Sequence, residues 1–352
     1  MSDKTGIQWT EATWNPATGC TKVSQGCKNC YAKYKAWPRL AAMKNNVYSG
    51  REFEDVQVHP GRLDQPLRWT KPRRIFVNSM SDLFHESIPF QFIADVFAVM
   101  SCTTRHTYQV LTKRPQRMLE FFNWLTYEDP WSDWPNQVNA LNVWPQWKPH
   151  HGHGGYDNCG PNWPLENVWL GVSVEDQQTA DERIPLLLKT PAVVHWVSAE
   201  PLLGPIKFGT YTLLTSHCFV CAIEDKLGQE RGTQSHPINC IHRTKSKDTT
   251  DVGEGISWVV VGGESGHNAR PTHPDWVRLI RDQCIASRVP FFFKQWGEWA
   301  PKNSGTGVMI DRVPDLEKFI SLDPSTLVYR TGKKSAGRSL DGREWNEYPS
   351  KD

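Results

Sequence analysis

The sequence lacks any apolar run of the roughly 18 residues that a membrane-spanning helix requires. Its first residues, Met1 to Gly6, also lack the apolar stretch and the cleavage-site plan of a signal peptide. We therefore expect a cytoplasmic protein that has no membrane partner.

A strong excess of charge of either sign is also missing. The formal net charge is +2 in 352 residues, which neither favours nor excludes nucleic acid as a partner, because such binding needs a basic domain or stripe. Hydrophobic residues make up 38% of the chain, which is enough for a substantial core, and 17 residues are tryptophan. We expect most of these indole rings in the core, with stacking on a base or on another ring as the alternative.

Short β-branched or aromatic runs alternate with helical stretches, which is typical of a parallel sheet with helices outside it. The expected strands span residues 7–9, 74–78, 107–112, 168–174, 193–198, 257–263 and 290–294. The expected helices span residues 31–43, 90–101, 115–125, 179–189 and 274–287. The sequence thus predicts an α/β barrel, partial or full, over residues 1–300, with insertions at about 127–163 and 208–255 and a polar C-terminal extension over residues 301–352.

Polar or charged side chains follow every expected strand, where a parallel barrel carries its active site. They are Thr10 and Glu11 after the first strand, then Ser79, Ser81, Asp82, Lys113, Arg114, Ser173, Glu175, Ser198, Glu200, Glu264, Ser265, Lys294 and Gln295. We interpret them together as the rim of a polar cavity. The alternative is ordinary helix capping, which would account for Asp82 and Glu175.

The strongest chemical signal is a cysteine group. Cys20, Cys27 and Cys30 lie within eleven residues, in a loop with two glycines after the first expected strand. Thiolates suit zinc or iron–sulfur clusters, and both a closed zinc site and a [4Fe–4S] cluster ordinarily take four protein ligands. Only three are local here, so one iron of a cluster would keep an open position for a small molecule. A zinc knuckle with a remote fourth ligand is the alternative, and a disulfide suits a cytosolic chain poorly.

The sequence around these cysteines resembles a phage-encoded three-cysteine-motif family. The similarity begins with Gly6–Pro16 and continues through residues 78–85, 111–115, 169–175, 198–202, 262–266 and 293–297. The layout also resembles radical SAM enzymes and, distantly, spore photoproduct lyase. Phage encoding would place the protein in the cytoplasm of the host.

This resemblance implies a partial (β/α)6 TIM-like barrel of radical SAM type. It implies a [4Fe–4S] cluster on Cys20, Cys27 and Cys30, with S-adenosyl-L-methionine (SAM) on the fourth iron and flavodoxin or ferredoxin as the reductant. Reductive cleavage of SAM would then give a 5′-deoxyadenosyl radical that removes a hydrogen from the substrate. Six residues separate Cys20 from Cys27, more than these enzymes usually have, whereas the two between Cys27 and Cys30 match them.

The same resemblance assigns residues to the parts of SAM. Ser79 and Asp82 correspond to positions that hold its amino group. Ser173 and Glu175 correspond to positions at its ribose. Lys113 or Arg114 would pair with its carboxylate.

The second expected insertion carries another metal candidate. Cys218, Cys221, Cys240 and His242 have a spacing similar to that of a zinc ribbon. A structural zinc ion would stabilise an insertion that has little apolar core of its own. A second iron–sulfur cluster and unligated side chains are the alternatives.

We interpret the chain as a radical SAM enzyme, with Lys113, Glu200 and Glu264 as catalytic candidates. The resemblance implies a nucleobase or nucleotide in DNA or RNA as the substrate. Two alternatives stay open. One is a zinc-stabilised nucleic-acid-binding protein, and the other is a metal-dependent barrel hydrolase that uses Glu175, Glu200 and Glu264.

Overall fold

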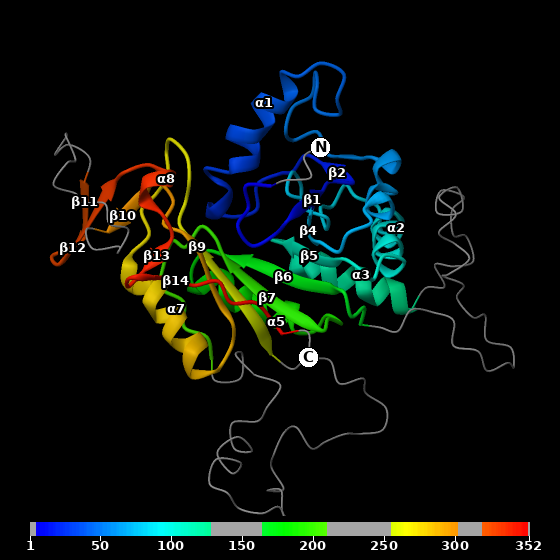
Figure 1. The fold of residues 1–352 in the computed structure, drawn as a ribbon. Helices are drawn as coiled ribbons and strands as arrows, with labels where there is room; N and C mark the ends of the chain where they lie inside the picture. The colour runs from blue at the N-terminus through cyan, green and yellow to red at the C-terminus, as the bar shows by residue number, and fades with distance from the viewer. Residues whose placement is uncertain (1–4, 128–163, 210–254, 302–318, 351–352) are drawn as a thin grey trace, which may run out of the picture.

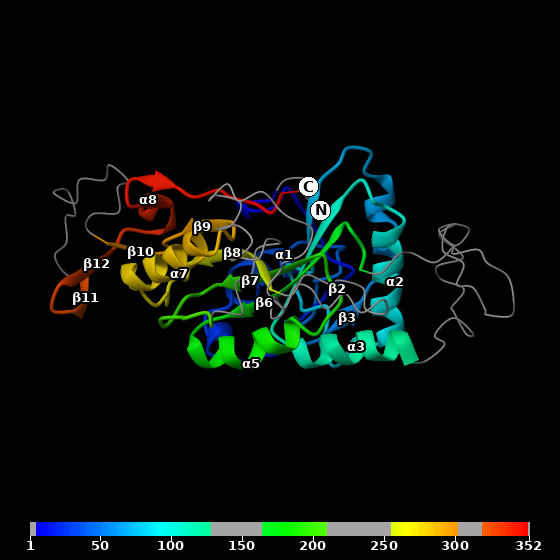
Figure 2. The same cartoon turned by 90° about the horizontal axis from the view of Figure 1, so that it is seen from below.

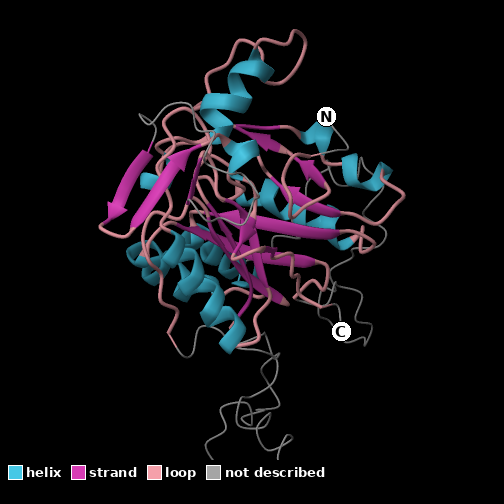
Figure 3. Ribbon diagram, turned by 60° about the vertical axis from the view of Figure 1, so that its left-hand side comes forward, coloured by secondary structure: helices cyan, strands magenta, loops and turns pink. Residues whose placement is uncertain are grey.

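The computed structural model describes residues 5–127, 164–209, 255–301 and 319–350. A seven-stranded parallel sheet forms its centre and curls into half a barrel (Figure 3). The strands, in their order across the sheet, are β1 (Ala12–Trp14), β4 (Arg74–Val77), β5 (Thr107–Thr112), β6 (Val168–Val174), β7 (Val194–Ala199), β8 (Ile256–Gly262) and β9 (Phe291–Gln295). The expected partial parallel α/β barrel is confirmed, with one strand more than the six that the resemblance implies.

Smaller elements surround this sheet. The helices are η1 (Gln25–Cys27), η2 (Ala32–Ala36), α1 (Trp37–Ala41), η3 (Pro60–Arg62), η4 (Gln65–Arg68), α2 (Phe90–Ser101), α3 (Pro115–Tyr127), α5 (Gln177–Leu187), α7 (Pro274–Ala286) and α8 (Lys333–Ala336). The remaining strands form antiparallel groups: β2 (Ala17–Thr18) with β3 (Gln57–Val58); β10 (Trp299–Pro301), β12 (Thr326–Arg330) and β11 (Phe319–Asp323); and β13 (Ser339–Leu340) with β14 (Arg343–Glu344). None of the helices in the described segments is long and apolar enough to cross a bilayer.

The first expected strand is wrong, whereas the other six are confirmed within a residue or two of their ends. The chain enters the sheet at Ala12–Trp14 and not at residues 7–9, because Ala12 to Trp14 pair with Ile75 to Val77 of β4. Thr10 and Glu11 therefore precede the strand. The Thr10 hydroxyl donates to the Arg74 carbonyl at 3.0 Å, so both residues lie at the amino edge of the sheet and not at the rim.

The two faces of the sheet have different cores. On the outer face, Val172, Val197 and Val259 pack with the apolar sides of α2, α3, α5 and α7. Figure 2 shows α3 and α5 next to each other along this layer. Helices of 11 to 13 residues with one apolar side are suited to covering parallel strands.

The inner face carries a separate cluster of indole rings. Trp9, Trp169, Trp196 and Trp258 pack with Phe292, and they fill the half-barrel toward its amino end. Gly171 leaves the space for Trp196, because a Cβ at residue 171 would lie 2.5 Å from the indole ring. The expectation that most tryptophans are core residues is confirmed for these rings.

The expected C-terminal extension returns to the barrel. Ala336, Leu340 and Trp345 belong to the main core, and the Trp345 carbonyl accepts from the Phe293 amide at 3.0 Å. The boundary at residue 300 stays a prediction. Nearly all of the two expected insertions lies outside the described residues.

Candidate functional site

The cysteine loop, residues 19–30, begins at the carboxyl edge of the sheet. Gly19 forms a parallel bridge with Ser81, and the Gly19 amide donates to the Met80 carbonyl at 3.0 Å. The Cys20 amide donates to the Phe53 carbonyl at 2.9 Å. Gly19 has φ +92°, and a Cβ there would lie 2.5 Å from the Asp55 carbonyl oxygen, so glycine allows this close entry.

The three thiols of the loop lie together and form no disulfide. Cys20, Cys27 and Cys30 are each partly buried. Cys20 and Cys30 pack against one small apolar cluster that includes Trp37 and Met80. Cys27 contributes electrostatically to the pKa of both Cys20 and Cys30, which is consistent with thiols that face a shared space.

Burial opposes ionisation of two of these thiols. Burial, followed by the negative charge of Asp82, raises the pKa of Cys20 to about 12, although the Arg114 guanidinium acts in the opposite direction. Burial also raises the pKa of Cys30, while hydrogen bonds from the Lys33 and Ala32 amides act against the shift. A metal that takes these sulfurs as thiolates must therefore displace protons from them.

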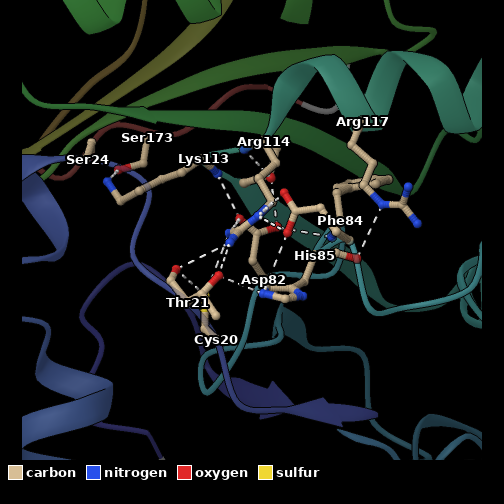
Figure 4. Close-up of polar contacts among 12 residues, drawn as sticks. Cys20, Thr21, Ser24, Asp82, Phe84, His85, Lys113, Arg114, Arg117 and Ser173 are labelled. Atoms are coloured by element: carbon tan, nitrogen blue, oxygen red, sulfur yellow. Dashed lines mark hydrogen bonds and ion pairs between the residues drawn. The ribbon is translucent and has the colours of Figure 1, made fainter. Parts of the chain in front are cut away.

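Arg114 joins the start of the loop to the strand ends (Figure 4). Its guanidinium donates to Cys20 Sγ at 3.7 Å and to Thr21 Oγ1 at 2.9 Å. It also meets Asp82 Oδ2 at 3.3 Å and Glu86 Oε1 at 3.0 Å. This side chain is 6% exposed, so these contacts account for its charge in the interior.

Asp82 has its hydrogen-bonding capacity filled. Oδ1 accepts from Thr112 Oγ1 at 2.7 Å and from the Phe84 amide at 3.0 Å. Oδ2 accepts from the Lys113 amide at 3.0 Å as well as from Arg114. Asp82 thus holds the ends of β4 and β5 in register beneath the cysteine loop.

His85 supports the loop from the same side. Its Nδ1 accepts from the Ser87 amide at 3.1 Å, so in the neutral ring Nε2 carries the proton and donates to Thr21 Oγ1 at 2.9 Å. Burial, followed by the charge of Arg114, lowers the pKa of His85. The ring therefore stays neutral at ordinary pH and acts as a fixed donor.

Glu175 forms the seat for the middle of the loop. Its side chain is 1% exposed, and its carboxylate pairs with Lys113 and, at 3.2 Å, with Arg183. Ser24 Oγ donates to Oε1 at 3.0 Å. Gly26 lies directly on this carboxylate, because a Cβ at residue 26 would lie 2.4 Å from Oε1.

Glu264 holds the far side of the loop. Asn29 Nδ2 donates to its Oε2 at 2.9 Å, and Arg270 meets its Oε1 at 2.6 Å. Arg270 also donates to the Gln25 carbonyl at 3.0 Å. Burial would raise the pKa of Glu264, but the hydrogen bonds from Arg270 and Asn29 outweigh it and hold the pKa below its ordinary value.

The remaining predicted residues lie at the ends of neighbouring strands. Glu200 Oε2 meets Lys294 Nζ at 3.1 Å, and Ser198 donates to the same oxygen. Ser173 accepts from Lys113 Nζ at 2.6 Å and donates to the Glu200 carbonyl at 3.1 Å. Ser79 Oγ donates to Asn15 Oδ1 at 3.2 Å.

A pocket of about 660 Å³ opens beside the loop. Residues 23–25 of the loop form one wall, and α3 and α5 form the others. Lys113, Arg114 and Glu175 reach it from the strand ends. The pocket therefore lies beside the cysteines and shares their supporting residues.

The structure brings most of the predicted residues to one edge of the sheet. It does not gather Glu175, Glu200 and Glu264 on one ion, as each pairs with a different cation. Among the described residues, no group of three or more His, Cys, Asp or Glu side chains is arranged to hold a single metal ion. Cys218, Cys221, Cys240 and His242 lie outside the described residues.

Several contact residues of the site were not predicted. Thr21 and Asn29 lie in the loop and join it to Arg114 and Glu264. Arg183 pairs with Glu175, and Arg270 donates to the loop. No local motif marks any of these positions. Arg270, for example, meets the Gln25 carbonyl across 245 residues of sequence.

The fold and the loop thus define an α/β half-barrel protein with a three-cysteine site on its carboxyl edge. The chain matches the family described as "Protein of unknown function (DUF5131)" over residues 4–349, and it belongs to that family. No curated protein matches the chain. Among solved structures, it is similar to a mutant of spore photoproduct lyase, with a TM-score of 0.34 and 11% identity over 94% of this chain and 72% of that chain. None of these matches bears on the expected phage origin.

Proposed function

We propose that the protein binds a [4Fe–4S] cluster through Cys20, Cys27 and Cys30 and acts as a radical SAM enzyme. The observation that supports this most is the position of three thiols in one anchored loop over the carboxyl edge of a parallel half-barrel. The other described cysteines, Cys102 and Cys284, lie at the end of α2 and near the end of α7, toward the amino edge. Three thiolates from one loop leave one iron of such a cluster open to SAM.

The donor set fits a cluster in several respects. A cluster gives each thiolate its own iron, so the sulfurs need not converge on a single ion. Arg114 donates to Cys20 Sγ, and a cationic donor favours the thiolate and tunes a bound cluster. When bound, the cluster would supply one electron to SAM, whose carbon–sulfur bond would break to give methionine and a 5′-deoxyadenosyl radical.

Two kinds of supporting residue follow from the contacts. Asp82, Arg114 and Glu175 already have their hydrogen-bonding capacity committed to the loop and to the strand ends, so they act as positioning residues. Ser79 and Ser173 make fewer contacts and are the better candidates to meet SAM directly.

The catalytic candidates differ in the same way. Glu264 and Lys113 hold the loop or its seat. Glu200, whose side chain is 15% exposed and paired with Lys294, is not committed to the loop. We assign Glu200 to contact with the substrate or to proton transfer at the rim.

The test is formation of 5′-deoxyadenosine by protein reconstituted with iron and sulfide without oxygen, then reduced with dithionite and given SAM. Wild type and Cys102→Ala should form it, because Cys102 lies outside the loop, whereas Cys27→Ala should not. A protein that takes up only zinc, or that forms no deoxyadenosine, contradicts the proposal.

A further inference from the structure

The segment that carries the three cysteines has charge of one sign only. Residues 12–51 contain seven Lys or Arg residues and no Asp or Glu. The whole chain has a formal charge of +2 and this segment alone contributes +7, so the rest of the chain is net negative. The near-neutral total conceals a basic region at the candidate site.

Five of these seven cations are exposed to solvent. Lys33 and Arg51 pair with Glu54 and Asp55. The other five are exposed and make no ion pair with any residue that the structure describes; they are Lys22, Lys28, Lys35, Arg39 and Lys44. Figure 1 shows α1, which carries Arg39, projecting from the body of the molecule. Exposed cations gathered in one region attract an anion that approaches the cysteine loop.

Two aromatic rings lie among these charges. Tyr31 is 53% exposed and Tyr34 is 54% exposed, within one helical turn of each other and directly after Cys30. Lys22 Nζ lies 5.9 Å and Lys33 Nζ 5.5 Å from the centroid of the Tyr34 ring. The loop and the helical segment therefore form one surface, in which cations lie next to two exposed rings.

We propose that this basic tyrosine surface, formed by Lys22, Lys28, Tyr31, Tyr34, Lys35, Arg39 and Lys44, binds single-stranded nucleic acid. Cations along a strand neutralise its phosphates, and exposed rings stack on unpaired bases. An acidic protein would pair with the cations but would not supply bases that stack on two adjacent exposed rings. That a bound strand is the substrate rests on the proposed function, whereas binding itself does not.

Fluorescence anisotropy of a labelled oligothymidylate, with reconstituted protein between about 50 and 200 mM salt, tests this surface. Five phosphate contacts predict that log K falls against log salt with a slope of about −3.5. Lys28→Gln with Lys35→Gln should reduce the slope by about 1.4. Tyr31→Ala and Tyr34→Ala should each weaken binding about tenfold and leave the slope unchanged.

The matched control is Lys71→Gln with Lys189→Gln. Both lysines are exposed and precede β4 and β7, so they lie at the amino edge, far from the cysteine loop. This pair should bind as wild type does. The proposal is overturned if the control pair loses as much affinity as the Lys28 and Lys35 pair, if the tyrosine variants bind normally, or if poly-L-glutamate competes as well as the oligonucleotide.

The same samples separate this proposal from the proposed function. Deoxyadenosine formation without oligonucleotide binding overturns the surface and leaves the radical SAM proposal standing. Oligonucleotide binding that follows the variants as above, in protein that never cleaves SAM, supports the surface and overturns the radical SAM proposal.

Discussion

Replacement of Gly26 by alanine should dislodge the cysteine loop from its seat. A Cβ at residue 26 would lie 2.4 Å from Glu175 Oε1 and 2.5 Å from its Cγ. The Glu175 side chain cannot swing away freely, because Lys113 and Arg183 hold its buried carboxylate. Overpacking of this kind costs about 1–3 kcal/mol, and separation of the ion pairs would bring the loss toward about 3–5 kcal/mol.

Two assays measure this effect. Thermal unfolding followed by circular dichroism should show a midpoint a few degrees lower, because one kcal/mol shifts it by about 1–2 °C in a chain of this length. Iron content after reconstitution should fall as well, since displaced ligand supports cost about 10–100-fold in metal affinity. Gly61→Ala is the control, because a Cβ there meets nothing within 4 Å. If Gly26→Ala unfolds and binds iron as Gly61→Ala does, the loop does not rest on Glu175.

Three further predictions follow from buried groups. Burial raises the pKa of Asp95 to about 7, above its ordinary 3.8. Between about pH 4 and 7 the carboxyl is therefore neutral in the folded protein but ionised in the unfolded chain. The free energy of unfolding should fall as pH rises through this range. Asp95→Asn should therefore gain up to about 4 kcal/mol at pH 8 and little at pH 4, and equal gains by urea unfolding at both would refute this account. Gly171→Ala should cost about 1–3 kcal/mol by the same method, since its Cβ would lie 2.5 Å from the Trp196 ring, and an unchanged unfolding midpoint would show that the ring can move. Arg114→Met should cost about 3–5 kcal/mol by leaving Asp82 buried without its cation, and a variant as stable as wild type that retains its full iron content would contradict the role assigned to Arg114.

Six strands of the seven-stranded sheet could be predicted, because the composition of each segment determines its structure locally. Residues 168–174 are apolar almost throughout and form a strand buried on both faces, as their composition indicates. The first strand could not be placed in the same way. Residues 7–9 have the stronger apolar pattern, yet the pairing of Ala12 to Trp14 with β4 decides the outcome, and that pairing joins residues far apart in sequence.

The candidate site could also be predicted only in part. The cysteine group and the strand-end residues follow from spacing and from the position of strand ends in a parallel sheet. The supports of the loop do not, because Arg270 meets the Gln25 carbonyl across 245 residues of sequence. Arg183 lies only eight residues after Glu175, but no motif marks it as the partner of that carboxylate. The basic tyrosine surface was detectable in the sequence as forty residues without Asp or Glu. The net charge of the chain does not reveal it, because the rest of the chain is net negative.

We propose that Cys20, Cys27 and Cys30 hold a [4Fe–4S] cluster with one iron open to SAM. Electron paramagnetic resonance of the anaerobically reconstituted, dithionite-reduced protein, recorded before and after addition of SAM, tests it most directly. We expect a reduced-cluster signal that SAM shifts and that Cys27→Ala lacks. A protein without such a signal, or a cluster signal that SAM leaves unchanged, would contradict it.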